Sequence, residues 1–367
     1  MLKEKVKNLV SLALAGCFLL GFLVWGILRP DADTSLTERR PLAQAPELST
    51  KTLLNGSFMT NFESYTLDQF PLRDAFRTVK ALSAFYVFRQ SDSNGIYIAD
   101  GHAAKLEYPM DTDSIDRAAE RFQDVYDRYL AGTDAKIYSV VVPDKSYFLA
   151  AKNGYLSMDY DAFFARFIEK TPFAENIPVA DLLEAEDYYR TDLHWRQERI
   201  GDVAARIAER MGVTLKDDYS VNEADAPFYG VYYGQSALPL PSERLYYLTS
   251  DTLEDCRVFD YETKQYLPVY DLSAPAGSDP YELFLFGSKS LLTVENPNAE
   301  TDRELIIFRD SFGSSIAPLL IEGYAKVTLV DIRYLSPMLL DRFLTFDGQD
   351  VLFLYSTSVL NNSITLK

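Results

Sequence analysis

The hydrophobic positions of this chain fall into three patterns, and each pattern predicts a different kind of element. An almost unbroken apolar run at residues 8–28 is long enough for a helix of about 30 Å, the thickness of a bilayer's hydrocarbon core. Apolar residues at helical spacing predict amphipathic helices, and short β-rich runs with few charges predict buried strands. The expected helices are 115–130, 158–169, 195–211 and 337–344, and the expected strands are 135–142, 177–182, 304–308, 325–330 and 351–355. Because strands alternate with helices, the sequence predicts an α/β fold around a parallel sheet.

Three strands should form the centre of that sheet. Residues 138–142, 306–308 and 325–330 are β-rich, mostly apolar and bounded by helices, so we expect them to be neighbouring parallel strands. The alternation is interrupted between residues 213 and 300, where short tyrosine-rich segments and many turn residues predict a β-rich antiparallel insertion.

The first half of the chain predicts smaller elements and the domain boundaries. Residues 52–88 have helical spacing broken near Pro71, which predicts two helices joined at a turn, and residues 95–106 predict a hairpin. We therefore divide the chain into a membrane anchor at 1–30, a polar linker at 31–50 and a folded domain at 51–367.

The charges around the first apolar run predict how it crosses the membrane. Lys3, Lys5 and Lys7 precede the run, and basic loops are retained in the cytoplasm, so everything from Asp31 onward is expected outside. The tetrapeptide that ends at Cys17 resembles a lipoprotein cleavage box, which is the alternative. The chain stays apolar beyond that cysteine, however, and this favours an uncleaved, single-pass anchor in the cell membrane.

Composition restricts the possible partners and cofactors. With 47% hydrophobic and 25% charged residues the chain is globular, and its net charge of −18 makes nucleic acid an unsuitable partner. The two cysteines, Cys17 and Cys256, cannot form a disulfide within the outer part, because the first lies in the anchor. With only two cysteines and two histidines a zinc site is not expected, and no pattern calls for a cofactor. The 25 tyrosines could stack on sugars or simply fill the core.

A candidate nucleophile follows the strand at 304–308. The strand stops at Arg309, Asp310 and Ser311, and a short helix is expected over 316–321. A buried strand that ends in a tight turn at a helix start would place Ser311 at the carboxyl edge of the sheet, beside free backbone amides. The alternative is that Asp310 or Ser311 only caps the helix.

A candidate general base is supplied by His194. The other histidine, His102, lies just past a turn glycine and is interpreted as structural. Asp192 and His194 are two residues apart, so in an extended segment both side chains would point the same way. Asp192 could then orient the ring while its other nitrogen faces Ser311. The alternative is that Thr191 or Asp192 caps a helix that opens at Trp195.

Several motifs resemble the DHHW family, a branch of the SGNH-hydrolase-like group that includes the alginate O-acetyltransferases. They are Asp192-Leu193-His194-Trp195, the later Arg309-Asp310-Ser311-Phe312, and Pro41-Leu42 followed by the residues 68–73. The motifs occur in the family's order, and the resemblance covers nearly the whole outer portion of the chain. The sequence departs from the family signature at Leu193, where a second histidine would stand.

The resemblance implies an SGNH-hydrolase-like fold in which Ser311 is the nucleophile, His194 the base and Asp192 the orienting carboxylate. By resemblance Gly230 and Arg333 are candidates for the oxyanion hole, and geometry adds the backbone amide of Ser311 or Phe312. The implied activity is O-acetylation of a cell-surface or secreted polysaccharide, with the acetyl group delivered by a partner of the membrane-bound O-acyltransferase type. A carbohydrate acetylesterase with the same three residues, or a non-catalytic polysaccharide-binding or assembly protein, are the alternatives.

Overall fold

The computed structural model describes residues 2–216 and 218–367, and their contacts divide the chain into two compact units. The first unit contains the residues up to Ser93 together with Gly234–Pro239, and the second contains Asn94–Tyr233 and Leu240–Lys367. The sequence predicted that one folded domain begins at residue 51. By contacts, residues 51–93 are grouped with the residues that precede them, and the predicted boundary at residue 51 stays a prediction.

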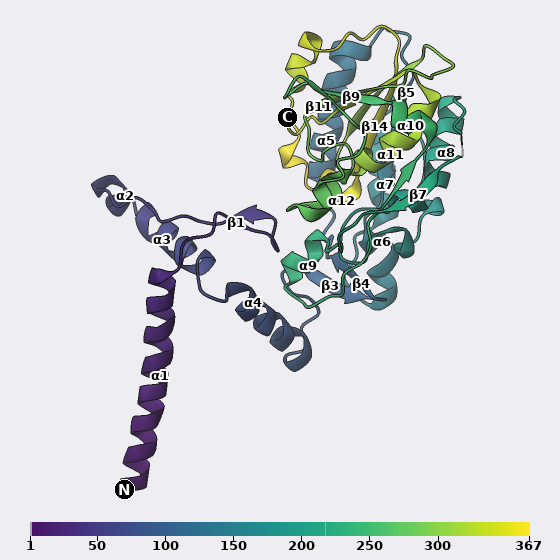
Figure 1. The fold of residues 1–367 in the computed structure, drawn as a ribbon. Coiled ribbons are helices and arrows are strands. Elements are labelled where there is room, and N and C mark those ends of the chain that lie inside the picture. Colours follow the sequence, from purple (N-terminus) through teal and green to yellow (C-terminus); the bar gives the residue numbers. More distant parts are fainter. Residues whose placement is uncertain (1, 217) are drawn as a thin grey trace. The chain divides into compact units, whose positions relative to one another are not determined.

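The first unit consists of helices and one very short strand pair (Figure 1). Its α1 is the one helix in the described part of the chain that is long and apolar enough to cross a membrane. The bounds are α1 Leu2–Leu28, β1 Thr34–Ser35, β2 Arg40–Pro41, α2 Thr50–Leu54, α3 Ser57–Asp68 and α4 Arg73–Leu82, continued by a π-helical turn at Ser83–Val87. The sequence predicted two helices here, but the first is split because Gly56 has a positive φ of 78°.

The second unit is built on an eight-stranded sheet in the order β10-β9-β11-β13-β12-β14-β5-β6. The strands are β5 Ile137–Val142, β6 Glu175–Asn176, β9 Arg257–Asp260, β10 Gln265–Leu267, β11 Leu291–Glu295, β12 Glu304–Arg309, β13 Lys326–Val330 and β14 Asp350–Ser356. The five from β13 to β6 are parallel, and β11, β9 and β10 add an antiparallel edge. The predicted α/β fold is therefore confirmed, and the insertion at 213–300 supplies strands to the edge of the same sheet.

Helices cover both faces of the sheet, as the strand pattern required. Alternate residues of β12 and β14 enter two different cores: Leu305 and Leu352 pack with α8 and α11, whereas Ile306 and Phe353 pack with α5 and α7. The helices are α5 Thr112–Val125, α7 Tyr160–Lys170, α8 Gly201–Met211 and α11 Phe312–Leu320. The result is a three-layer arrangement whose central strands are buried on both sides.

Smaller elements complete the second unit. They are the hairpin β3 Ile96–Ala99 and β4 His102–Lys105, the pair β7 Ser220–Glu223 and β8 Tyr246–Thr249, and the short helices α6 Lys145–Leu149, α9 Val231–Ser236, α10 Asp251–Asp255 and α12 Thr357–Leu360. The predicted hairpin is confirmed. Helix α9 begins in the second unit and ends in the first.

Some predicted elements differ from those observed. The strand expected at 177–182 is replaced by the two-residue β6 and a 3-10 turn, because Pro178 cannot donate to a ladder. The helix expected from Trp195 begins only at Gly201. β12 and β13 are neighbours as predicted, but β14 lies between β12 and β5. The segment 337–344 forms a 3-10 helix at Pro337–Arg342.

The parallel strands bring polar residues to one edge of the sheet. Asp144 follows β5, Asp310 and Ser311 follow β12, Asp331 follows β13, and Ser356 ends β14. In open α/β sheets this carboxyl edge is where ligands bind, because every parallel strand delivers a loop there.

Candidate active site

Three side chains form a continuous hydrogen-bonded relay at the carboxyl edge. Ser311 Oγ lies 2.7 Å from His194 Nε2, and Asp192 Oδ1 lies 2.6 Å from His194 Nδ1. Since a carboxylate faces Nδ1, the ring proton belongs on that nitrogen, which leaves Nε2 free to accept from the serine hydroxyl. Asp192 is completely buried and Ser311 is only half-buried, so the hydroxyl end of the relay is the end that a substrate can reach.

Asp192 and His194 belong to a tight loop, and the extended segment expected from the sequence is wrong. An isolated bridge joins Tyr188 to Trp195, and the loop between them folds so that Asp192 Oδ1 also accepts from the His194 amide at 3.1 Å. This is an Asx turn, in which a short side chain bonds the backbone two residues on. No helix opens at Trp195, so helix capping by Thr191 or Asp192 does not explain the motif.

A network of polar hydrogen bonds centred on Glu243 holds this loop in place. Glu243 accepts from the Thr191 amide at 2.7 Å, the Thr191 hydroxyl at 2.7 Å and the Arg190 amide at 2.8 Å. Thr191 Oγ1 in turn accepts from the Gly230 amide at 2.9 Å, and Asp192 Oδ2 accepts from the Val231 amide at 2.8 Å. Each oxygen of Asp192 therefore has a partner, and the carboxylate is fixed in one orientation.

Lys145 is a second support for the same loop. It is 2% exposed, and its ammonium donates to the carbonyls of Tyr189 at 2.9 Å and Arg190 at 3.3 Å, and also to that of Ala103. Burial lowers the pKa of Lys145 from 10.5 to about 7, while the nearby carboxylate of Asp192 opposes that shift. The lysine side chain thus ties the backbone before Asp192 to the start of α6.

The turn at Ser311 is fixed by its neighbour Asp310. Asp310 Oδ1 accepts from the Phe312 amide at 3.0 Å, and Oδ2 accepts from the amide and hydroxyl of Ser356 at 2.8 and 2.7 Å. This carboxylate joins the end of β12 to the end of β14 and partly caps α11. Ser311 occupies the N-cap position of α11 but its side chain makes no capping bond. Its hydroxyl is thereby left to His194.

Aromatic packing fixes the plane of the imidazole. The ring of Tyr281 stacks on His194 with centroids 3.8 Å apart and an angle of 5°. Tyr281 and Trp195 both donate to Ser315 Oγ at 2.8 Å, so the stacking tyrosine is itself anchored to α11. Burial raises the pKa of the Tyr281 phenol well above 10, which keeps it a neutral donor.

The oxyanion candidates have partners of their own. The Phe312 amide donates to Asp310, and the Gly230 amide donates to Thr191. The guanidinium of Arg333 forms a bidentate pair with Asp331, at 2.9 and 2.6 Å. Gly230 instead allows a close approach, because a Cβ on it would lie 2.3 Å from the Thr191 carbonyl carbon. Of the candidates from the sequence, the Ser311 amide stays a prediction.

His102 lies outside the relay, as its structural interpretation expected. The ring is 4% exposed, and its Nδ1 has no partner among the residues that the structure describes. Burial lowers the pKa of His102 from 6.5 to about 4, and the positive charge of Lys145 adds to the effect, whereas Glu186 and Asp100 oppose it.

This buried histidine predicts a loss of stability in acid. Because its folded pKa lies below its unfolded value, the folded state binds fewer protons between pH 6.5 and 4, so stability falls as the pH drops through that window. We expect His102→Leu to abolish up to about 3 kcal/mol of this acid-dependent loss. Urea unfolding at pH 7 and pH 4.5 measures the difference, and equal losses in the parent and variant would refute the assignment.

Several residues of the site have no signal in the sequence. Glu243 and Tyr281 lie in the irregular segment 213–300, far along the chain from Thr191 and His194. Lys145 follows a predicted strand, but nothing in its surroundings shows that it will be buried. Asp310 is the exception, since its position beside Ser311 already suggested a cap.

Comparison with solved structures gives the same fold. The chain resembles a DHHW family protein from Eubacterium siraeum, with a TM-score of 0.62 and 22% identity over 75% of this chain and 95% of that one. The chain has the fold of a DHHW family protein. Bacillus cereus PatB1 is also similar, with a TM-score of 0.57 and 18% identity over 72% of this chain and 96% of PatB1. PatB1 with a sulfonyl adduct matches with a TM-score of 0.55 and 17% identity over 72% and 94%. No protein-family model and no curated protein matches the sequence.

Proposed function

We propose that this chain is a membrane-anchored, extracytoplasmic O-acetyltransferase that modifies a cell-surface or secreted polysaccharide. The observation that carries the proposal is the relay from Asp192 through His194 to Ser311, which joins residues more than a hundred positions apart in hydrogen-bonding geometry. Structural needs alone give no reason for a half-buried hydroxyl to meet an imidazole that is held by a buried carboxylate. The choice of acetyl groups and polysaccharide rests on the motif resemblance to the alginate O-acetyltransferases.

The chemistry follows from the positions of the three side chains. Ser311 Oγ attacks the carbonyl carbon of an acetyl thioester or ester while His194 Nε2 takes its proton, and Asp192 stabilises the imidazolium that forms. The tetrahedral intermediate collapses when His194 returns the proton to the leaving thiol or alcohol, and an acetyl ester of Ser311 remains. A sugar hydroxyl then gives its proton to His194 and attacks that ester. The second intermediate collapses when His194 passes this proton to Ser311 Oγ, which releases the acetylated sugar and restores both residues. The Ser311 amide is suited to bind the negative oxygen of both intermediates.

The site requires an acetyl donor that is available outside the cytoplasm. We infer that the N-terminal lysines hold the start of α1 inside, so the second unit works on the far side of the membrane. Cytoplasmic acetyl-CoA cannot reach this site directly. A membrane-bound O-acyltransferase-type partner that carries acetyl groups across is therefore part of the proposal.

Transfer and hydrolysis are separated by a competition experiment. The purified chain is incubated with p-nitrophenyl acetate, with and without an oligosaccharide, and the peptide containing Ser311 is analysed by mass spectrometry. We expect an acetyl group on Ser311 that disappears faster when the oligosaccharide is present, together with acetylated sugar. Deacetylation at the same rate with or without sugar would favour an acetylesterase. If Ser311 is never acetylated but the sugar still binds, the protein is a binding scaffold.

A further inference from the structure

Helix α4 buries its arginines and exposes its large apolar side chains, which is the reverse of a surface helix in a water-soluble domain. Its arginines face the protein: Arg73 pairs with Glu38 at 2.6 Å, and Arg77 contacts Glu38 at 3.0 Å and the Gly234 carbonyl at 2.8 Å. The arginine side chains are only 17% and 19% exposed. The arginine face of α4 is therefore the face that packs within the first unit, whereas Asp74 and Lys80 of the same helix are exposed.

The apolar side chains of α4 point outward. Those on one face of α4 and its two flanks, here called the outer face, are Phe76 at 42% and Val79 at 59% exposure within the helix, Leu72 at 50% just before it, and Tyr86 at 76% and Val87 at 70% in the π-helical turn that follows. An amphipathic surface helix in water turns this face to the core and its charges to the solvent. The reversal indicates that the medium around the outer face is apolar.

Contacts with α1 give the depth at which α4 starts. Phe22 of α1 stacks on Phe70 with centroids 5.4 Å apart and an angle of 2°, and it meets Phe76 edge-on at 5.7 Å. Phe22 lies six residues before the end of α1, which is about 9 Å inside the apolar helix at 1.5 Å per residue. Pro71 also lies beside α1, because its Cδ is 3.7 Å from where a Cβ on Gly26 would stand, an ordinary contact distance. Phe70 and Phe76 thus lie at the level of the last two turns of the apolar helix α1.

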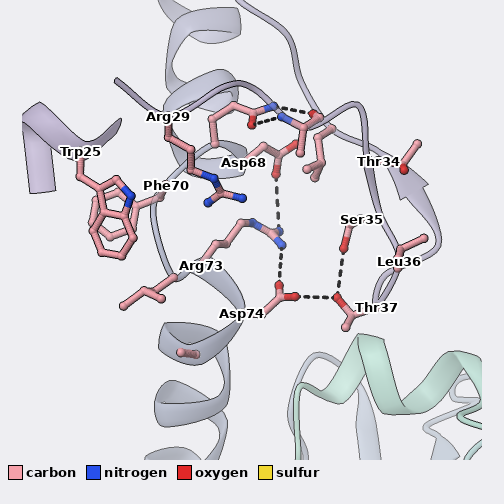
Figure 2. A pocket seen from close by; sticks show the side chains of 15 residues that line it. Trp25, Arg29, Thr34, Ser35, Leu36, Thr37, Asp68, Phe70, Arg73 and Asp74 are labelled. Atoms are coloured by element: carbon pink, nitrogen blue, oxygen red, sulfur yellow. Dashed lines mark hydrogen bonds and ion pairs between the residues drawn. The ribbon is translucent and has the colours of Figure 1, made fainter. Parts of the chain in front are cut away.

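The pocket at the end of α1 has the composition of a membrane interface. It measures about 820 Å³ and is lined in part by Trp25, Arg29, Phe70 and Arg73 (Figure 2). Tryptophan and arginine gather where the hydrocarbon meets the headgroups, because one part of each side chain is apolar and the other polar. Figure 1 shows α4 leaving this region without continuing the axis of α1.

We propose that the outer face of α4 inserts into the bilayer leaflet at the carboxyl end of α1. The helix then acts as an interfacial support that holds the first unit against the membrane, in addition to the spanning helix. This inference rests on the part of the proposed function that places α1 in the membrane, and it adds a second membrane-binding surface to it.

Single-cysteine labelling tests the proposal in the full-length chain. Cys17→Ser and Cys256→Ser first remove the native thiols, and Val79→Cys then places a fluorescent label on the outer face. Thr78→Cys is the matched control, because it is similar in size and turned by about 100° around the helix. Each protein is reconstituted in phosphatidylcholine vesicles. In one measurement the lipids carry an acyl-chain nitroxide quencher, and in the other iodide is added to the buffer. We expect lipid quenching about threefold stronger at residue 79 than at residue 78, and weaker iodide quenching.

A third protein carries only Cys256→Ser, so that the label attaches to the native Cys17. It distinguishes failure of this proposal from failure of the membrane anchor. Lipid quenching at residue 17 together with iodide quenching at residue 79 would overturn the insertion of α4. The outer face would then be exposed to water and available to a protein partner. Quenching at residue 79 that weakens when protein is diluted in lipid would also overturn it, in favour of a second copy. No lipid quenching at either position would refute the anchor and the insertion together.

Discussion

Replacing Ser311 with alanine is expected to lower acetyl transfer by about 10,000-fold or more, because Ser311 Oγ is the hydroxyl that His194 Nε2 contacts in the relay. His194→Ala should have a similar effect. The double variant should be little worse than either single one, since the residues act as one unit. Asp192→Asn should also cause a large loss, because an amide in place of the carboxylate can donate to Nδ1 and reverse the ring tautomer. Initial rates with p-nitrophenyl acetate and an oligosaccharide measure these effects.

Ser314→Ala is the matched control for this series. Ser314 lies three residues along the same helix, is 1% exposed, and has a hydroxyl without a partner in the part of the chain that the structure describes. Its removal breaks no hydrogen bond, so transfer should stay near that of the parent protein. If Ser311→Ala keeps the activity of Ser314→Ala, the relay is not the catalytic group and the scaffold interpretation replaces it.

Replacing Gly230 with alanine is expected to have the second largest effect. The added Cβ would lie 2.3 Å from the carbonyl carbon of Thr191 and 2.4 Å from the Cβ of Asp192, so the backbone of the loop would have to move. Overpacking of this kind costs about 1 to 3 kcal/mol. A displacement of the carboxylate near 1 Å would lower the rate about 100-fold. Thermal unfolding and initial rates report the two effects separately.

Gly201→Ala provides the comparison for that substitution. Gly201 begins α8, and a Cβ there would meet nothing within 4 Å. Alanine in a helix is favoured over glycine by about 0.5 to 1 kcal/mol, so this variant should be slightly more stable and fully active. Equal behaviour of the two alanine variants would contradict the close packing of Gly230 on the loop.

The sequence predicted the central layers of the fold because each depends on local pattern. The strands at 306–308 and 351–355 are apolar at every position, which requires cover on both faces, and helices α5, α7, α8 and α11 provide it. Ser311 was found for a similar reason, as a strand followed directly by a turn and a helix defines an edge position. The sequence could not predict which strands join the antiparallel edge or that β14 lies between β12 and β5, because strand order depends on contacts between distant segments.

The pairing of Asp192 with His194 was predicted by an incorrect route. Spacing by two residues suggested a strand, whereas the observed contact arises from an Asx turn that Glu243, Lys145 and Val231 hold in place. Those three supports come from separate parts of the chain, and a buried carboxylate or lysine gives no periodic signal. Residue types identified the chemistry here, but long-range packing determined the geometry.

The return of the chain to the first unit at Gly234–Pro239 affects how the protein can be shortened. Thr37 packs so closely on Gly234 that no side chain could fit there, and Arg77 and Ser93 donate to the carbonyls of Gly234 and Ser236. Only two residues separate Val231, whose amide holds Asp192, from Gly234. A fragment that starts at Asn94 would therefore lose every one of these contacts, and the last residues of α9 would lose the side chains that pack on them. Residues 34–93 are consequently the packing partners of Gly234–Pro239 within the first unit, and a truncation that keeps this segment packed has to retain the residues from Thr34 onward.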